Sequence, residues 1–293
     1  MKKKLKILLT TILFGLMTQA WAQTTLQVAN RHFEKDFEQI KALKLDAEKA
    51  DIEIIVWNKS KVSLSADLSA KHPEKNTAAH DLNFLKLAID VKNGVLHTRN
   101  YILLSQKDQK PESNFKTKYV IRIPAGLEME LKNSFGKINI SGETKKLTLN
   151  SEFCINSLSK ISGNTKIQTK YGEVKIDEIE GTTNIKTERT NLSLRAFSGN
   201  ISIVSFYGEI LLNGPKEVQN LTLNADKSEI KLIAIPIKKL ALNLSTIFGQ
   251  IITPTEMGKV KMTKKTAQLI FNSNEKSSMN ITNKSGNITL EKL

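Results

Sequence analysis

Apolar and polar positions recur with a period of eighteen residues along the second half of the chain. The segment from Leu131 to Ile140 is the template: it begins with an apolar residue, carries Phe135-Gly136 in the middle and ends in alternating apolar positions. The first position is apolar in every copy, which indicates a structural repeat. The nine copies are residues 131–140, 149–158, 167–176, 185–194, 203–212, 221–230, 244–253, 262–271 and 281–290.

A unit of eighteen residues is too short for a helix–turn–helix repeat and suits one coil of a β-solenoid. Segments such as 137–140 alternate with period two, so Ile138 and Ile140 can face a core while their neighbours face solvent. Glycines at fixed spacing fit sharp corners. The sequence therefore predicts an all-β fold, a right-handed parallel β-solenoid of about nine coils, with handedness taken from the general rule for parallel crossovers. An antiparallel sandwich, the alternative, gives no reason for a constant period.

The aromatic-Gly pair falls mainly in alternate copies, which gives a super-period of 36 residues. Cys154, Thr190, Asp226 and Ala267 take the place of glycine in the other copies, so we expect those corners to differ. The ninth copy ends close to Leu293, and no C-terminal cap is evident in the sequence.

Residues 23–130 lack the repeat and alternate as β-strands do. We expect strands at 42–47, 51–57, 61–66, 85–89 and 119–123, joined by polar loops at 71–81 and 106–114. The spacing of Phe33, Phe37 and Ile40 also permits a short helix. This strand-rich lead-in is predicted to cap the first coil, which would otherwise expose unpaired backbone.

The first 22 residues have the pattern of a signal peptide. Four lysines precede an apolar stretch, and Ala20-Trp21-Ala22 resembles a cleavage site. The apolar stretch is shorter than the roughly 20 residues that a membrane span needs. We therefore predict a leader at 1–22, a lead-in at 23–130 and a solenoid at 131–293, with no transmembrane segment after the leader is removed.

The composition includes 44 basic and 29 acidic residues, a formal net charge of +15. Four of the positive charges belong to the predicted leader. Most of the remaining excess of basic residues lies in the repeats, where many acidic residues are interspersed with them. Proteins that bind single-stranded nucleic acid place exposed aromatic residues between their basic residues. The sequence pattern does not indicate such an arrangement here, so nucleic acid is not an expected partner.

The residues that could carry chemistry are few. Cys154 is the one cysteine, and we interpret it as a small residue at a corner, because no histidine follows His97 to activate a thiol. His32, His72, His80 and His97 lack the spacing of helical zinc sites. His72, His80 and Asp81 share a loop, which leaves a metal site there open, but we interpret them as solvated loop residues.

Glu173 and Glu209 stand at equivalent positions two coils apart. At about 4.8 Å per coil, the two residues would lie roughly 10 Å from one another. That spacing is loosely compatible with an inverting carboxylate pair. Outward positions are otherwise dominated by Lys, Asn, Thr and Ser, and no cleft is implied. We predict no catalytic residue, no cofactor and no metal ligand.

Tyr119-Val120-Ile121-Arg122-Ile123-Pro124-Ala125-Gly126, followed by repeated Phe/Tyr-Gly-x-Ile-x-Ile units, resembles the bacterial putative-adhesin domain family. The resemblance covers nearly the whole chain after the leader and implies an exported domain without an agreed activity. The expected function is non-catalytic, adhesin-like binding of a surface polymer, glycan or partner protein through a repetitive polar face. An alternative is a periplasmic structural or envelope-signalling component that assembles end to end, and a third is a β-helix carbohydrate-active enzyme. The expected location is extracytoplasmic, either the periplasm or the cell surface.

Overall fold

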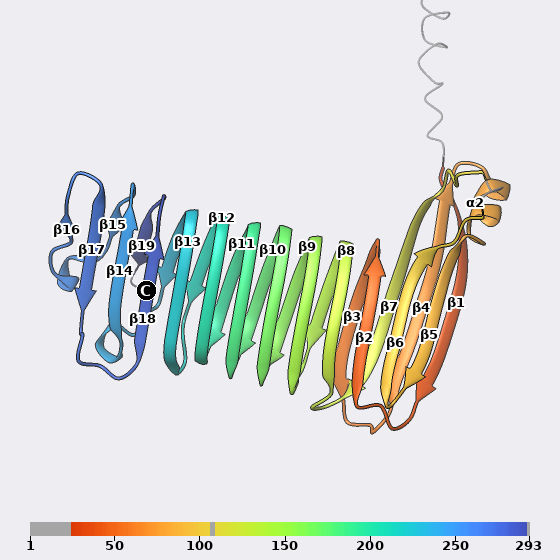
Figure 1. The fold of residues 1–293 in the computed structure, drawn as a ribbon, viewed down its shortest axis with the longest axis horizontal. Coiled ribbons are helices and arrows are strands. Elements are labelled where there is room, and N and C mark those ends of the chain that lie inside the picture. Colours follow the sequence, from red (N-terminus) through yellow and green to blue (C-terminus); the bar gives the residue numbers. More distant parts are fainter. Residues whose placement is uncertain (1–24, 106–108, 292–293) are drawn as a thin grey trace, which may run out of the picture.

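The computed structural model describes residues 25–105 and 109–291. The predicted leader at 1–22 lies outside this part of the chain. Strands account for most of the described residues and stack side by side along one long axis (Figure 1). The prediction of an all-β, solenoid-like fold is confirmed, whereas right-handed coiling stays a prediction.

The middle of the molecule is a regular parallel stack. Each strand pairs in parallel with the next at an offset of eighteen residues, so that Leu131, Leu149, Ile167, Ile185 and Ile203 lie side by side. All five are buried. The strands are β8 (Glu128–Ser141), β9 (Lys146–Ile161), β10 (Asn164–Ile179), β11 (Thr182–Phe197), β12 (Gly199–Asn213) and β13 (Val218–Ile233).

Each of these long strands turns a corner near its middle. In β9 the turn falls at Phe153, whose φ is 53°, and the corresponding residue of every strand from β8 to β13 also has positive φ. The part before the corner belongs to one wall of a flattened tube and the part after it to the opposite wall. We call these the front wall and the back wall. The apolar side chains of both walls meet between them and form the core.

Glycine is required at alternate corners because consecutive coils approach closely there. A Cβ added to Gly172 would lie 2.1 Å from the carbonyl oxygen of Cys154, and one added to Gly208 would lie 2.3 Å from that of Thr190. At the corners between these, the residues in the glycine position are Cys154 and Thr190, and their side chains are buried. This alternation explains the super-period of 36 residues.

The sixth coil is shifted by two residues from the predicted register. Ile203 pairs with Leu223, not Leu221, because one extra residue precedes Val218 and an irregularity at the start of β13 adds a second. The strand alternates with period two, so a shift of two keeps apolar residues inside. The corner residue that replaces glycine in this coil is therefore Ser228 and not Asp226.

The last three copies do not follow one another in space. The ninth copy, β18 (Ser278–Asn283) and β19 (Ile288–Glu291), pairs in parallel with β13 on one side. On its other side it pairs with the seventh copy, β14 (Ala241–Ile247) and β15 (Ile251–Ile252). The C-terminal strands thus lie inside the stack (Figure 1).

The eighth copy is not a coil. It forms a hairpin of β16 (Lys261–Met262) and β17 (Thr266–Phe271), and β17 runs antiparallel to β14. The sequence shows no evident cap, but this hairpin ends the stack beyond β14 (Figure 1). Ala267, expected at a corner, is a buried residue of β17. Two short 3₁₀ helices, Ile237–Lys239 and Thr255–Met257, lie in the links on either side of β14 and β15.

The lead-in contributes to the same walls. β2 pairs in parallel with the first part of β8 and β3 with its second part, with Leu45 beside Leu131 and Ile54 beside Ile140. The predicted boundary between residues 130 and 131 falls inside β8. β6 and β7 then pair in parallel with β2 and β3. The strands are β2 (Ala42–Glu48), β3 (Ala50–Trp57), β6 (Val95–Ile102) and β7 (Asn114–Pro124).

Antiparallel strands end the stack on the N-terminal side. β5 (Leu85–Lys92) pairs with β6, β4 (Val62–His72) with β7, and β1 (Gln27–Phe37) with β4. The segment around Phe33 and Phe37 is therefore a strand, and the alternative of a short helix there is wrong. A helix, α2 (Lys75–Asp81), occurs instead in the predicted polar loop at 71–81.

Candidate functional site

A shallow groove of about 680 Å³ runs across the front wall from β8 to β12. It crosses five consecutive coils, because residues eighteen apart in the sequence stand side by side on its surface. Two outward columns line it: Lys132, Asn150, Gln168, Lys186 and Val204, and then Ser134, Glu152, Lys170, Glu188 and Phe206.

The charges in this groove are largely paired. Lys170 Nζ lies 2.9 Å from Glu188 Oε2, and this contact raises the pKa of Lys170 above its ordinary value. Lys132 lies 3.7 Å from Asp46. Lys186 has no ion pair within residues 25–105 and 109–291. Among the described residues, Lys186 and Glu152 are thus the charged side chains of the groove that form no ion pair, and both stand among amides and hydroxyls. This lining fits a polar ligand better than a densely anionic one.

Small polar side chains form a buried column beneath the groove. Ser151 Oγ donates to Thr169 Oγ1 at 3.0 Å, and Thr187 Oγ1 donates to Ser205 Oγ at 2.9 Å. Buried hydroxyls that are paired in this way cost little and hold neighbouring coils in register. The sequence shows these residues at eighteen-residue spacing, yet their polarity hides that they face inward.

A ladder of aromatic and cationic side chains runs along the corner beside the groove. Phe135 stacks on Phe153, and Phe153 stacks on Tyr171, each with 4.9 Å between ring centroids. Arg189 follows, 5.7 Å from the ring of Tyr171 and 5.6 Å from that of Tyr207. Stacking and cation–π contacts favour the corner geometry and so offset the cost of positive φ at these residues.

The C-terminal half of the front wall carries an uncharged patch. Its outward residues are amides, hydroxyls and a few apolar groups, arranged in rows by the pairing of β12, β13, β18, β14 and β17. The uncharged patch consists of Asn200, Ser202, Val204, Asn220, Thr222, Asn224, Ser278, Asn280, Thr282, Ala241, Asn243, Ser245, Gln268 and Ile270.

The residues considered for chemistry do not converge. The Cys154 thiol is buried beside Asn133, and burial raises its pKa, so it is a poor nucleophile. Glu173 and Glu209 stand in one outward column of the back wall with Asn191 between them. Glu173 pairs with Lys175 at 2.8 Å, and neither glutamate lines the front groove.

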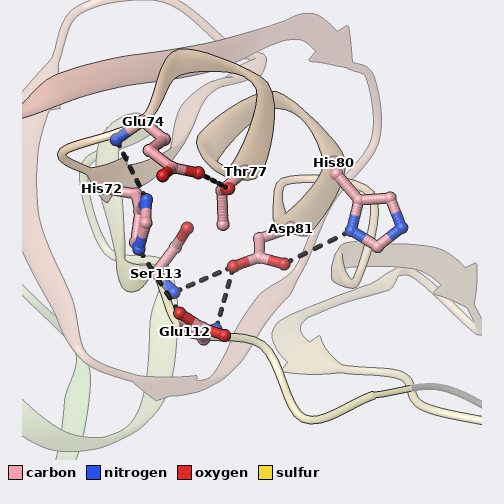
Figure 2. Close-up of polar contacts among 7 residues, drawn as sticks. All are labelled: His72, Glu74, Thr77, His80, Asp81, Glu112 and Ser113. Carbon is pink, nitrogen blue, oxygen red and sulfur yellow. Dashed lines mark hydrogen bonds and ion pairs between the residues drawn. The ribbon is translucent and has the colours of Figure 1, made fainter.

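His72, His80 and Asp81 do not form a metal site. His80 points away from His72 on the other side of Asp81 (Figure 2). Asp81 is buried, and its Oδ2 accepts hydrogen bonds from the backbone N–H groups of Glu112 and Ser113 at 3.0 and 2.9 Å. Within residues 25–105 and 109–291, no group of three or more His, Cys, Asp or Glu residues could hold a metal ion.

Asp81 instead joins α2 to the segment that leads into β7. Burial acts to raise the pKa of this carboxyl, but the hydrogen bonds from Ser113, His80 and Glu112 outweigh it, and the pKa is lowered below 3.8. The prediction that Asp81 is a solvated loop residue is wrong, because the helix turns its carboxylate inward (Figure 2).

Paired strands in two walls around one apolar core define an all-β, solenoid-like protein. The chain belongs to the Toastrack DUF4097 family, whose model matches residues 40–291. This match is consistent with the resemblance to putative-adhesin domains. In the described part of the chain, no helix is both long and apolar enough to cross a membrane.

Solved structures with similar arrangements come from several bacteria. A "putative adhesin" from Parabacteroides merdae is 12% identical, with a TM-score of 0.43, and the match covers 91% of this chain and 96% of that one. A "putative adhesin" from Bacteroides fragilis is 12% identical, with a TM-score of 0.36 and coverage of 89% and 97%. A "putative lipid binding protein" from Parabacteroides distasonis is 11% identical, with a TM-score of 0.39 and coverage of 91% and 97%. No curated protein matches the chain, and similarities at this level carry no functional argument.

Proposed function

We propose that this protein is an exported, non-catalytic binding protein that holds an extended polymer along its front wall. The observation that carries the proposal is the groove that crosses five coils from β8 to β12. Its lining repeats at the spacing of the coils, about 4.8 Å. A repeating surface matches a repeating ligand, because each added ligand unit meets a similar set of groups without a new binding event.

The predicted leader at 1–22 supports export, either to the periplasm or to the cell surface. Adhesion to a surface polymer, a glycan or a partner protein fits this location. We prefer a polymer because the groove is long and shallow rather than closed. Assembly end to end, the alternative, loses its motive: the C-terminal strands lie inside the stack, and the β16–β17 hairpin ends it.

A pair of tryptophan substitutions on one coil tests the proposal. Gln168 lines the front groove, whereas Lys175 faces outward from the back wall of the same strand, β10. The experiment measures binding of the chain without its leader to soluble neutral and anionic polysaccharides. We expect Gln168→Trp to weaken polymer binding roughly tenfold and Lys175→Trp to leave it unchanged.

Failure to bind any polymer at low salt would contradict the proposal. Equal loss of affinity in both variants, or loss in Lys175→Trp alone, would also contradict it. Urea denaturation of both variants checks that each retains the stability of the parent, so that a loss of binding reports on the groove.

A further inference from the structure

The uncharged patch on the C-terminal half of the front wall contrasts with the rest of the surface. A quarter of the residues in the chain are charged. None of the patch residues on β12, β13, β18, β14 and β17 carries a charge. Asp226 and Lys284, next to the corner, lie 4.0 Å apart at the edge of the patch. An uncharged outward surface across five strands is therefore unusual for this chain.

The back wall of the same coils shows that the fold does not demand this composition. Its outward positions on β12, β13 and β19 include Glu209, Glu229, Lys231 and Glu291. Lys231 and Glu291 form an ion pair at 2.8 Å. Charged side chains are thus compatible with these strands. On the front wall they are missing from the rows of the patch, and Asp226 and Lys284 lie outside these rows. Solubility favours charge on such a surface, so its absence on one side points to a binding role.

The amides and hydroxyls of the patch are held in place by one another. Asn220 Nδ2 donates to Asn200 Oδ1 at 3.3 Å, and Ser278 Oγ donates to Asn220 Oδ1 at 3.0 Å. Asn280 Nδ2 in turn donates to Ser278 Oγ at 3.3 Å. These contacts connect three neighbouring strands. A surface whose polar groups are already ordered loses less side-chain entropy when a ligand binds.

The chemistry of the patch favours a ligand that is polar and uncharged. An anionic polymer would place carboxylates or phosphates against groups that carry no compensating charge. Sugar hydroxyls, by contrast, both donate and accept hydrogen bonds, as Asn, Ser and Thr side chains do. Val204, Ala241 and Ile270 add apolar contacts for the faces of sugar rings.

We infer that the uncharged patch binds a neutral, hydroxyl-rich polysaccharide. The inference rests on the proposed function and names the ligand class for one part of the front wall. Such binding depends on hydrogen bonds and shape, so it is insensitive to salt. Binding of an anionic polymer to the lysines of the groove would weaken as salt is added.

The test uses dextran, galactomannan and xyloglucan as neutral probes, and polygalacturonate and alginate as anionic ones. Two lysine substitutions on one coil provide a matched pair: Asn280→Lys in the centre of the patch and Thr289→Lys on the back wall. We expect the parent to bind at least one neutral probe equally at low and high salt. Asn280→Lys should lower that affinity roughly tenfold, and Thr289→Lys should leave it unchanged.

The outcomes separate this inference from the proposed function. Binding of anionic probes only, with a strong salt dependence, overturns the neutral ligand and leaves polymer binding standing. If neutral probes bind and Asn280→Lys does not weaken their binding, the placement of the binding site on the uncharged patch is overturned. Binding of no probe at all overturns both. Equal urea midpoints for the two variants exclude a loss of fold as the cause of weaker binding.

Discussion

At the scale of single residues, Asp81 shows how a group that could suggest a metal site serves the fold instead. Its carboxylate accepts two backbone hydrogen bonds from the segment before β7 while its helix contacts β1 and β4. Arg31 of β1 donates to the backbone carbonyls of Leu82 and Leu85, just after the same helix. Together these contacts connect α2 to β1, β4 and the start of β7, which belong to the back wall at the N-terminal end.

Replacing Asp81 with asparagine should destabilise the protein by about 2 kcal/mol, since a buried charge-assisted acceptor is lost. The lowered pKa sets the sign of the pH dependence. A carboxyl with a lowered folded-state pKa contributes its stability above pH 3.8, and this contribution is lost as the pH falls through the folded value. The advantage of the parent over Asp81→Asn should therefore shrink on acidification.

Urea denaturation of the parent and the variant at a series of pH values measures this difference. Asp90→Asn is the control, because Asp90 is exposed on β5. An Asp81→Asn variant as stable as the parent at neutral pH would show that the carboxylate does not hold this end of the molecule. A difference that grows towards acid pH would contradict the assigned sign.

At the scale of elements, the distinguishing feature is that the strands near the C-terminus are stacked in a different order from their order in the sequence. β18 lies between β13 and β14, although some forty residues separate it from β13 in the sequence. A strand inserted in this way is paired on both sides. β18 and β19 are thereby built into the interior of the stack, and the links that include the 3₁₀ helices and the hairpin pass around them.

Engineered cysteines test this order directly. Thr222 and Asn280 are direct neighbours, and Asn280 is also the neighbour of Asn243. We expect Thr222→Cys with Asn280→Cys to form a disulfide, since neighbouring strands lie about 4.8 Å apart. Thr222→Cys with Asn243→Cys should stay reduced, because these positions are two strands apart. Electrophoresis without reductant distinguishes the two pairs.

The opposite result, a disulfide between positions 222 and 243 alone, would mean that the strands stack in chain order. Cys154 is buried and present in both variants, so single-cysteine variants at 222, 243 and 280 control for its participation.

The sequence predicted the solenoid-like fold because the period constrains every coil from β8 to β12. It could not predict the register of β13, since Leu221 and Leu223 are both apolar and both face inward. Nor could it predict that the ninth copy inserts before the seventh, because each copy presents a similar apolar column to either neighbour. Pairing in that region depends on the lengths of the links and on the capping hairpin.

Only part of the candidate site could be predicted in the same way. The repeated Lys, Asn and Thr at outward positions indicated a polar surface. The division of those positions between two walls depends on where each coil turns, and aromatic residues such as Phe153 and Tyr171 at positive φ gave no local sign of it. The contrast between the uncharged patch and the charged back wall of the same coils therefore appears only in the structure.

At the scale of the whole molecule, the front wall changes in character from one end to the other. Near the N-terminal end it is densely charged, with ion pairs such as Lys44 to Glu130 at 3.1 Å. The groove follows, with Lys186 unpaired, and then the uncharged patch begins at β12. A polymer lying along this wall would meet different chemistry along its length, and such a gradient can select one class of ligand.

The dependence of affinity on ligand length tests the central claim that the front wall holds an extended polymer. The measurement is calorimetric titration with oligosaccharides of increasing length, prepared from the polysaccharide that binds best. The account predicts that affinity rises with each added unit until the ligand spans five strands, about 20 Å, which is the extent of the groove and of the uncharged patch, and then levels off. Affinity that is already complete with a single sugar or a disaccharide would mean a small closed site, and it would contradict the account.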